Sequence, residues 1–144
     1  DDYCILKGNI NIGSNVHISA FCYLAAVRSK IIIGNLTGIS SRVSIVATSD
    51  NFLSNNLTNP TVNIKFRDEI HKPVIIGKNV SIGTNVTVLP GAKIGDSCSI
   101  IAGSVISNNV KNGLVFGNKR LNQIFFKKNL KQINSKIKNF EKKK

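Results

Sequence analysis

Residues 73–106 read PVIIGKNVSIGTNVTVLPGAKIGDSCSIIAGSVI, and within this stretch an aliphatic residue returns at every sixth position. The leading residues are Ile76, Ile82, Val88, Ile94, Ile100 and Ile106. A period of six does not fit a helix, because 3.6 residues per turn would spread the apolar residues around the axis. Short strands separated by tight corners do fit, since β-branched residues favour extended backbone and Gly or Asn tolerates positive φ. The repeats therefore predict a parallel β-helix, in which each coil packs against the coils on either side.

The same period extends toward the start of the chain, with interruptions. Three units lead with Leu6, Ile12 and Ile18. A continuation from Leu24 would place Arg28 in the interior, so we expect the register to shift there and to resume at Val27. Four units then run to Ser49, which is expected to point inward. Three, four and six units make thirteen, or a little over four triangular coils of eighteen residues.

Residues 46–73, between the two repeat regions, lose the period. The segment is polar and is flanked by regular units, so it is expected to form one long loop that leaves a coil. Loops of this length are uncommon unless they are functional. We therefore predict a β-helix domain over residues 1–118 with the loop 46–73 inserted, followed by a basic C-terminal segment over residues 119–144.

Positive charge is concentrated in the C-terminal segment. The chain has a net charge of +13, and residues 111–144 contain eleven Lys and Arg against one Glu. The spacing of Phe126, Leu130, Ile133, Ile137 and Phe140 predicts an amphipathic helix. Its apolar stripe is expected to pack on the β-helix, on sister helices or at a membrane surface. The lysines are expected to form a solvated face, with an anionic membrane as the alternative, whereas nucleic acid is not expected because the tail lacks exposed aromatic residues.

Composition points to the cytoplasm. No apolar run reaches the length that spans a bilayer, and no signal-peptide pattern opens the chain. The three cysteines, Cys4, Cys22 and Cys98, are expected to be reduced core residues. We expect a cytoplasmic protein, with peripheral contact to the inner face of the membrane through the basic tail as an alternative.

The segment from Pro73 to Val110 resembles the hexapeptide-repeat acyltransferases, and above all the small sugar and polysaccharide O-acetyltransferases of the maltose and galactoside type. It follows the pattern IGxNVxIGxxVxVxPGxxIGxxxxIxAGS, and GNKRL at residues 117–121 is similar to that family's AGNPAK element, with Lys119 in place of the usual proline. The resemblance implies an all-β fold, a left-handed parallel β-helix with one long loop and a C-terminal α-helix. It also implies a homotrimer with active sites between subunits and acetyl-CoA as the acyl donor.

The same resemblance implies a set of cofactor contacts. Matched to the family's motifs, these are Thr84, Ala102, Ser107, Lys119 and Arg120. The chemistry is consistent, since pantetheine amides pair with backbone groups along a strand edge and phosphates favour Lys and Arg. Thr84 and Ala102 would, however, occupy corner or face positions in any β-helix.

Acyl transfer from a thioester needs a general base that takes the proton of the attacking group. Of the two histidines, His17 is expected on the surface, whereas His71 lies at the end of the loop. The sugar acetyltransferases of the family place their catalytic histidine near the start of the loop, where residues 47–51 contain none. Three interpretations remain: His71 supplies the base, Asp50 acts as the base or orients His71, or the protein is a weak or inactive member.

Polar loop residues supply candidate substrate contacts, namely Asn51, Asn59, Arg67 and Asp68. We expect an acetyl-CoA-dependent O-acetyltransferase that acts on a hydroxyl of a sugar or surface-polysaccharide precursor. The alternatives are an N-acetyltransferase of a nucleotide-linked amino-sugar, an antibiotic acetyltransferase and a non-catalytic β-helix scaffold. A zinc hydratase of the carbonic anhydrase type is not expected, because that site needs three histidines and the chain has two.

Overall fold

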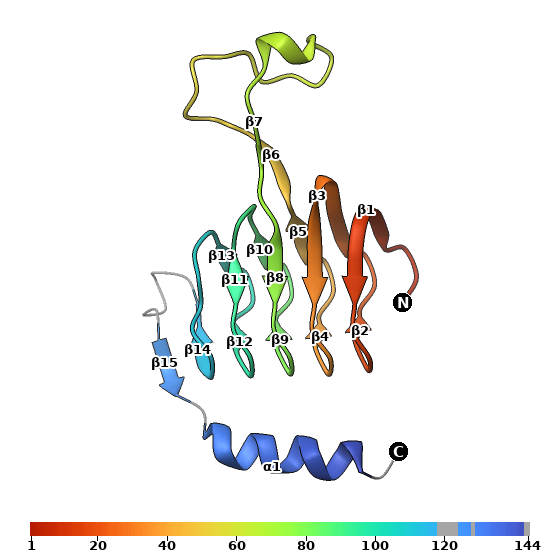
Figure 1. Ribbon diagram of the computed structural model, residues 1–144, viewed down its shortest axis with the longest axis vertical. Helices are drawn as coiled ribbons and strands as arrows, with labels where there is room; N and C mark the ends of the chain where they lie inside the picture. Colours follow the sequence, from red (N-terminus) through yellow and green to blue (C-terminus); the bar gives the residue numbers. More distant parts are fainter. Residues whose placement is uncertain (118–123, 128, 143–144) are drawn as a thin grey trace.

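The computed structural model describes residues 1–117, the backbone of residues 124–127 and residues 129–142. Short strands wind into stacked coils that form a three-sided prism, with a long loop projecting from one corner and a helix lying along another (Figure 1). As the chain advances from the N-terminus, it descends along the front face in Figure 1 and rises along the back, which is a left-handed turn. The predicted β-helix with one long loop and a C-terminal helix is confirmed.

The prism has three faces of parallel strands. Face A holds β8 (Val74–Ile76), β11 (Lys93–Ile94) and the C-terminal halves of β1 (Ile5–Ile12) and β3 (Tyr23–Ile33). Face B holds β2 (His17–Ile18), β4 (Gly38–Ile39), β9 (Ser81–Ile82), β12 (Ser99–Ile100) and β14 (Leu114–Phe116). Face C holds β5 (Ser44–Val46), β10 (Thr87–Val88), β13 (Val105–Ile106) and the N-terminal halves of β1 and β3.

The interior of the prism is filled by the six-residue leads. All six leads predicted between residues 76 and 106 are buried, with at most 3% of their surface exposed. On face B, Ile39, Ile82 and Ile100 lie directly above one another in register. Stacking of identical aliphatic side chains therefore forms one continuous core along the prism axis.

The glycine after a lead has a steric role at the corner between faces A and B. The Asp96 carboxylate accepts a hydrogen bond from the Lys78 backbone N–H at 2.8 Å, one coil away. A Cβ on Gly77 would lie 2.3 Å from that carboxylate oxygen, so only glycine leaves room for this bond. Gly95 and Asn112 repeat the arrangement in the next coil, where a Cβ would lie 2.2 Å from the amide oxygen. The Ile76-Gly77 and Ile94-Gly95 pairs thus mark corners at which a side chain satisfies the backbone of its neighbour.

The expected register shift occurs at the corner between faces C and A. Gly8 pairs with Ala26, but the next residue, Asn9, pairs with Lys30. Arg28 adopts a φ of 58° in the longer turn and is exposed, as expected. The prediction that Val27 points inward is wrong, since it belongs to this turn and is 39% exposed.

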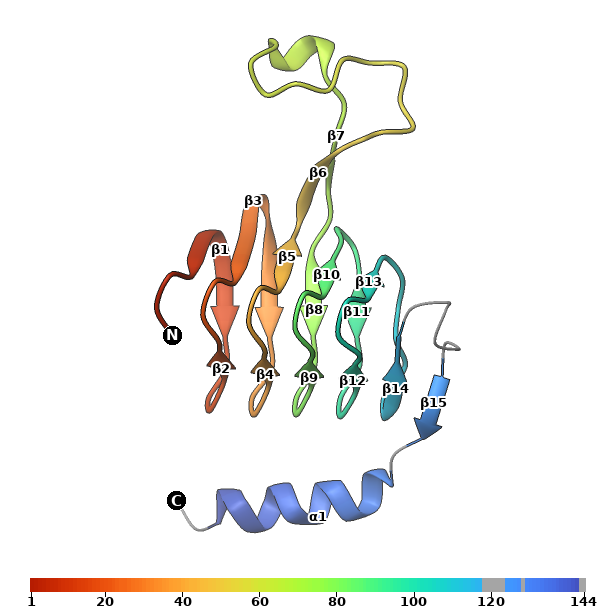
Figure 2. The same cartoon turned by 180° about the vertical axis from the view of Figure 1, so that it is seen from behind.

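The loop begins with a ribbon that stands away from the prism (Figure 2). Strands β6 (Thr48–Asp50) and β7 (Glu69–His71) pair antiparallel, and a short 3-10 helix, η1 (Ile64–Phe66), lies beyond them. The prediction that Ser49 points into the core is wrong, because Ser49 belongs to this ribbon. The backbone N–H of Lys72 donates to the carbonyl of Ala47 at 3.1 Å, so the loop leaves and rejoins the same coil at adjacent points.

The C-terminal segment adds a strand and a helix. Strand β15 (Ile124–Lys127) pairs antiparallel with β14, and α1 (Leu130–Glu141) follows it. Phe126 therefore belongs to a strand, and its assignment to the helix is wrong. Ile133, Ile137 and Phe140 line a groove of about 580 Å³ together with the corner residues Leu36 and Asn79, so the stripe faces the β-helix although no residue of α1 is buried. The predicted boundary between residues 118 and 119 lies outside the described residues.

Helix α1 contains twelve residues. Among the described parts of the chain, no helix is long and apolar enough to cross a membrane.

Candidate functional site

Charged residues gather where the loop joins the prism. In the β6–β7 ribbon, Thr48 lies opposite His71 and Asp50 lies opposite Glu69. Because side chains alternate along a strand, Glu69 and His71 project from the same side of β7. Together with Arg28 and Arg67, these two pairs form what we call the loop-base cluster.

Glu69 lies at the centre of the loop-base cluster. Its Oε2 is 3.0 Å from Nη1 of Arg28 and 3.0 Å from Nε2 of His71, and its Oε1 accepts a hydrogen bond from Arg67. Only 11% of the Glu69 side chain is exposed. Partial burial strengthens these charge-assisted contacts, so one carboxylate holds together the loop and a corner of the second coil.

Both ring nitrogens of His71 have partners. Nε2 faces Glu69, and Nδ1 lies 3.2 Å from Oγ1 of Thr48, which itself donates to the backbone carbonyl of Val27. An imidazolium satisfies both contacts by donating from each nitrogen. A neutral ring with Nε2–H donating to Glu69 satisfies the second contact only if the Thr48 hydroxyl gives up its bond to Val27 and donates to Nδ1 instead. In either state both ring nitrogens of His71 are already engaged.

Asp50 and Arg67 extend the cluster into the loop. Nη2 of Arg67 lies 3.8 Å from Oδ1 of Asp50, and its Nη1 donates to the carbonyl of Pro60 at 3.3 Å. The Nε of Arg67 is buried and has no hydrogen-bond partner among the described residues. The guanidinium thus bridges Asp50 and Glu69, which would otherwise repel each other across the ribbon.

Two other predicted substrate contacts have local structural roles. The side-chain amide of Asn51 donates to Asp68 at 2.8 Å and closes the ribbon. The side-chain oxygen of Asn59 accepts from the backbone and hydroxyl of Thr61, as in an ordinary Asx turn. Neither residue belongs to the loop-base cluster.

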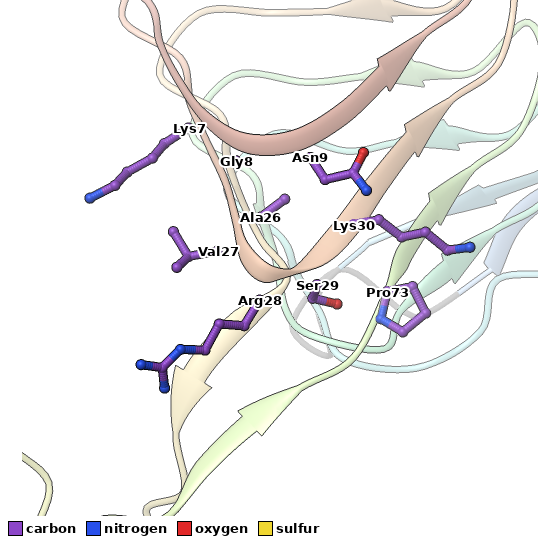
Figure 3. Close-up of a pocket in the computed structure, with 9 residues that line it drawn as sticks. All are labelled: Lys7, Gly8, Asn9, Ala26, Val27, Arg28, Ser29, Lys30 and Pro73. Carbon is purple, nitrogen blue, oxygen red and sulfur yellow. The ribbon is translucent and has the colours of Figure 1, made fainter. Parts of the chain in front are cut away.

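A hollow of about 710 Å³ lies beside this cluster at the corner between faces C and A. It is lined by Lys7, Gly8, Asn9, Ala26, Val27, Arg28, Ser29, Lys30 and Pro73. Figure 3 shows Lys7 and Arg28 extending to one side of the turn, whereas Lys30 extends to the other. Basic side chains therefore surround the hollow. One of them, Arg28, also contacts Glu69 of the loop-base cluster.

The predicted cofactor contacts lie on two different corners. Thr84 and Ala102 occupy the corner between faces B and C, where the Thr84 hydroxyl donates to the carbonyl of Ser41 at 2.7 Å. Ser107 follows β13 and is exposed near the loop corner. Lys119 and Arg120 lie outside the described residues. Within one chain, face C thus separates Thr84 and Ala102 from the loop-base cluster.

The other histidine is placed as expected. His17 points outward from face B, and its side chain is 65% exposed. No group of three or more His, Cys, Asp or Glu residues that could bind a metal ion occurs among the described residues.

Sequence reasoning missed Glu69, Arg28 and Thr48. Glu69 could have been found from the sequence, because Glu69 and His71 are two residues apart just before a strand and therefore share a face. Arg28 and Thr48 had no comparable signal, since their contacts with the loop end depend on how two coils stack.

Comparison with known proteins agrees with this architecture. Residues 73–108 match the model of the family described as bacterial transferase hexapeptide (six repeats). The chain belongs to this hexapeptide-repeat family. Its sequence is 32% identical over 109 residues to dTDP-4-amino-4,6-dideoxy-D-glucose acyltransferase of Escherichia coli. The aligned region covers 74% of this chain and 56% of that protein. It is also 32% identical over 111 residues to the galactoside O-acetyltransferase of Escherichia coli K12. Here the aligned region covers 72% of this chain and 50% of that protein.

Among solved structures, the chain is similar to AntD, an N-acyltransferase from Bacillus cereus bound to dTDP and 3-hydroxybutyryl-CoA. The TM-score is 0.89 at 26% identity, over 99% of this chain and 75% of AntD. A variant of AntD has been solved with dTDP-4-amino-4,6-dideoxyglucose and coenzyme A. The hexapeptide-repeat chain described here thus spans about half the length of the two sequence relatives and three quarters of AntD.

Proposed function

We propose that this hexapeptide-repeat protein transfers an acetyl or similar short acyl group from coenzyme A to the amino group of a nucleotide-linked amino-sugar. The observation that supports this most strongly is the match to AntD over 99% of the chain, with a TM-score of 0.89. The 32% identity to an acyltransferase of a dTDP-linked amino-sugar points the same way. N-acylation, an alternative at the level of sequence, is therefore preferred to O-acetylation.

The reaction requires a neutral amine and a base. The amine nitrogen attacks the thioester carbonyl carbon, a C–N bond forms and the C–S bond breaks. The nitrogen gives up one proton, and coenzyme A leaves as the thiol. A positioned base contributes about 10²–10⁴-fold to such a step, and the rest comes from holding the amine and thioester together.

The loop-base cluster supplies two candidates for the base. Imidazole is the side chain most often used as a general base, and the ring of His71 becomes available if an incoming amine displaces Thr48 or Glu69. The Asp50 carboxylate is held less tightly than the imidazole of His71. Its contact with Arg67 spans 3.8 Å, and its side chain is 25% exposed. We propose His71 as the base and Asp50 as a group that binds the ammonium form of the acceptor before its proton is lost.

Two variants test this assignment. His71→Ala is expected to lower kcat by about 10²-fold or more, and Asp50→Asn chiefly to raise KM for the amino-sugar. His17→Ala is the matched control, since His17 lies on face B, away from the loop. Full turnover in both loop variants would rule out this site.

A second candidate is O-acetylation of a sugar hydroxyl, favoured by the identity to galactoside O-acetyltransferase. The two reactions are separated by offering equal concentrations of an amino-sugar nucleotide and its hydroxyl analogue with acetyl-CoA. We expect transfer to the amine to dominate. A non-catalytic scaffold predicts no thermal stabilisation by millimolar acetyl-CoA, whereas an acyltransferase gains stability from the bound donor.

We further propose that the working form is a homotrimer with its sites between subunits. Thr84 and Ala102 lie across face C from the loop-base cluster, so a donor bound at the first corner would meet the base of a neighbouring copy. The family resemblance implies the same arrangement. Sedimentation velocity is expected to give a trimer, and a stable active monomer would refute the shared site.

A further inference from the structure

The outer surface of face C over the first two coils has an unusual composition. Strand alternation turns Leu24 inward, where it is fully buried, and thus turns Tyr23 outward. In the neighbouring strand β1, Ile5 and Lys7 point outward by the same rule, and Ile5 pairs with Tyr23. Exposed apolar side chains therefore lie next to cations on one face.

An aromatic pair stands at one edge of this surface. The rings of Tyr3 and Phe21 are stacked with centroids 5.2 Å apart and planes 7° from parallel. They are 77% and 58% exposed. Both residues have positive φ, 59° and 63°, which is unfavourable for bulky side chains. In the third and fourth turns of this corner the positive φ falls on Arg42 and Asn85, so the rings are not required by the turn itself.

Two cations stand at the opposite edge. Lys7 and Arg28 extend to the same side of the loop corner in Figure 3. Arg28 contacts Glu69, which in turn contacts His71. The surface thus presents, in order, flat rings, positive charges and the proposed base. Tyr3 and Lys7 are four residues apart, or about 13 Å in extended chain.

We propose that this surface, the nucleotide face of Tyr3, Phe21, Tyr23, Lys7 and Arg28, binds the nucleoside diphosphate part of the acceptor. This inference rests on the proposed function. The base stacks on the exposed aromatic rings, and the diphosphate contacts Lys7 and Arg28. The sugar at the far end of the diphosphate then lies toward Glu69 and His71. The order of groups on the face matches the order of groups in a nucleotide-linked sugar.

Titration of the full chain with dTDP and with inorganic pyrophosphate tests the two halves separately. Phe21→Ala is expected to weaken dTDP binding at least about fivefold and to leave pyrophosphate binding unchanged. Lys7→Gln is expected to weaken both about tenfold. Phe21→Tyr, which keeps a ring, should bind dTDP like the wild type. The matched controls are Phe140→Ala on α1 and Lys93→Gln on face A, and both should bind dTDP normally.

Three results would overturn the inference. The first is wild-type dTDP affinity in Phe21→Ala and Lys7→Gln while the wild type still acylates the nucleotide-linked sugar; the proposed function would then stand without this face. The second is competition between dTDP and coenzyme A, which also contains a nucleoside diphosphate, because the proposal places them apart. The third is a changed oligomeric state of Phe21→Ala with unchanged dTDP binding, which would make the rings a contact between copies. Absence of both dTDP binding and acyl transfer in the wild type would refute the proposed function as well.

Discussion

His71 Nε2 and Glu69 Oε2 lie 3.0 Å apart on the same side of strand β7. The contact fixes the orientation of the imidazole, and Thr48 holds the other ring nitrogen at 3.2 Å. A ring held at both ends is well placed but already engaged. If His71 is the base, as proposed, substrate binding must replace one of these contacts, and the partners of His71 then matter as much as His71 itself.

Glu69→Gln tests the central position of this carboxylate. The change keeps the shape of the side chain but removes the charge that Arg28, Arg67 and His71 share, so we expect at least about tenfold lower turnover and reduced stability. Activity assays and urea unfolding measure the two effects. Glu141→Gln, at the exposed end of α1, is the control and should match the wild type. Unchanged turnover in Glu69→Gln would show that the loop-base cluster is structural only.

Gly77→Ala tests the corner arrangement between stacked coils. A Cβ at this position would lie 2.3 Å from the Asp96 carboxylate oxygen and would displace the cap on Lys78, at a cost of about 1–3 kcal/mol in unfolding free energy. Gly38→Ala is the matched control, because nothing lies within 4 Å of its Cβ position. Urea unfolding of both variants gives the comparison. Equal stabilities would mean that the corner accommodates a methyl group without loss of the hydrogen bond.

Ile82→Ala probes the stacked core. Ile82 is 1% exposed between Ile39 and Ile100, so its truncation should cost about 2–5 kcal/mol. Ser81→Ala, one residue earlier on the outer side of the same strand, should change the unfolding free energy by less than about 0.5 kcal/mol. A small effect at Ile82 would contradict a tightly packed prism interior.

The buried thiol of Cys22 should make the free energy of unfolding depend on pH. Burial raises the pKa of the Cys22 thiol above its ordinary value. Between the ordinary and the raised pKa the folded chain keeps a proton that the unfolded chain has lost, so stability falls as pH rises through that alkaline window. Cys22→Ala should remove this part of the decline, by up to about 1.4 kcal/mol per pH unit. Parallel slopes of unfolding free energy from pH 8.5 to 10.5 in the two proteins would contradict the prediction.

The coils could be predicted from the sequence because the six-residue period is a local property with one steric solution. Ile76 through Ile106 repeat without a slip, and each lead is buried. Departures from the predicted interior appear where the period breaks and at the open N-terminal end of the prism, where Leu6 and Ile12 are 47% and 43% exposed. The six-residue period predicts Val27 and Ser49 inside the prism, whereas a longer turn contains Val27 and the β6–β7 ribbon contains Ser49. Phe126 continued a helical spacing by coincidence, since pairing with β14 takes its segment into a strand.

The candidate site was less predictable than the fold. His71 and Asp50 were found because few titratable residues lie in the loop, and the ribbon brings both to its base. Their shared partners were not found, because Arg28 and Glu69 are 41 residues apart and meet only when the second coil stacks beside the loop. Sequence spacing reports contacts along a strand or helix, but it does not report contacts between a corner and an inserted loop.

The hydrogen bond from Lys72 to Ala47 closes the loop at its neck. The outer part of the loop, residues 52–66, can change in length or composition while the ribbon and the stacked coils keep their register, since lengthening a closed loop costs little entropy. Under the proposed function, the preference for an acceptor can therefore change by exchange of this outer segment alone. Chimaeras that graft a foreign segment in place of residues 52–66, and so keep Asp50 and His71, would under the proposed function test whether this part of the loop selects the acceptor.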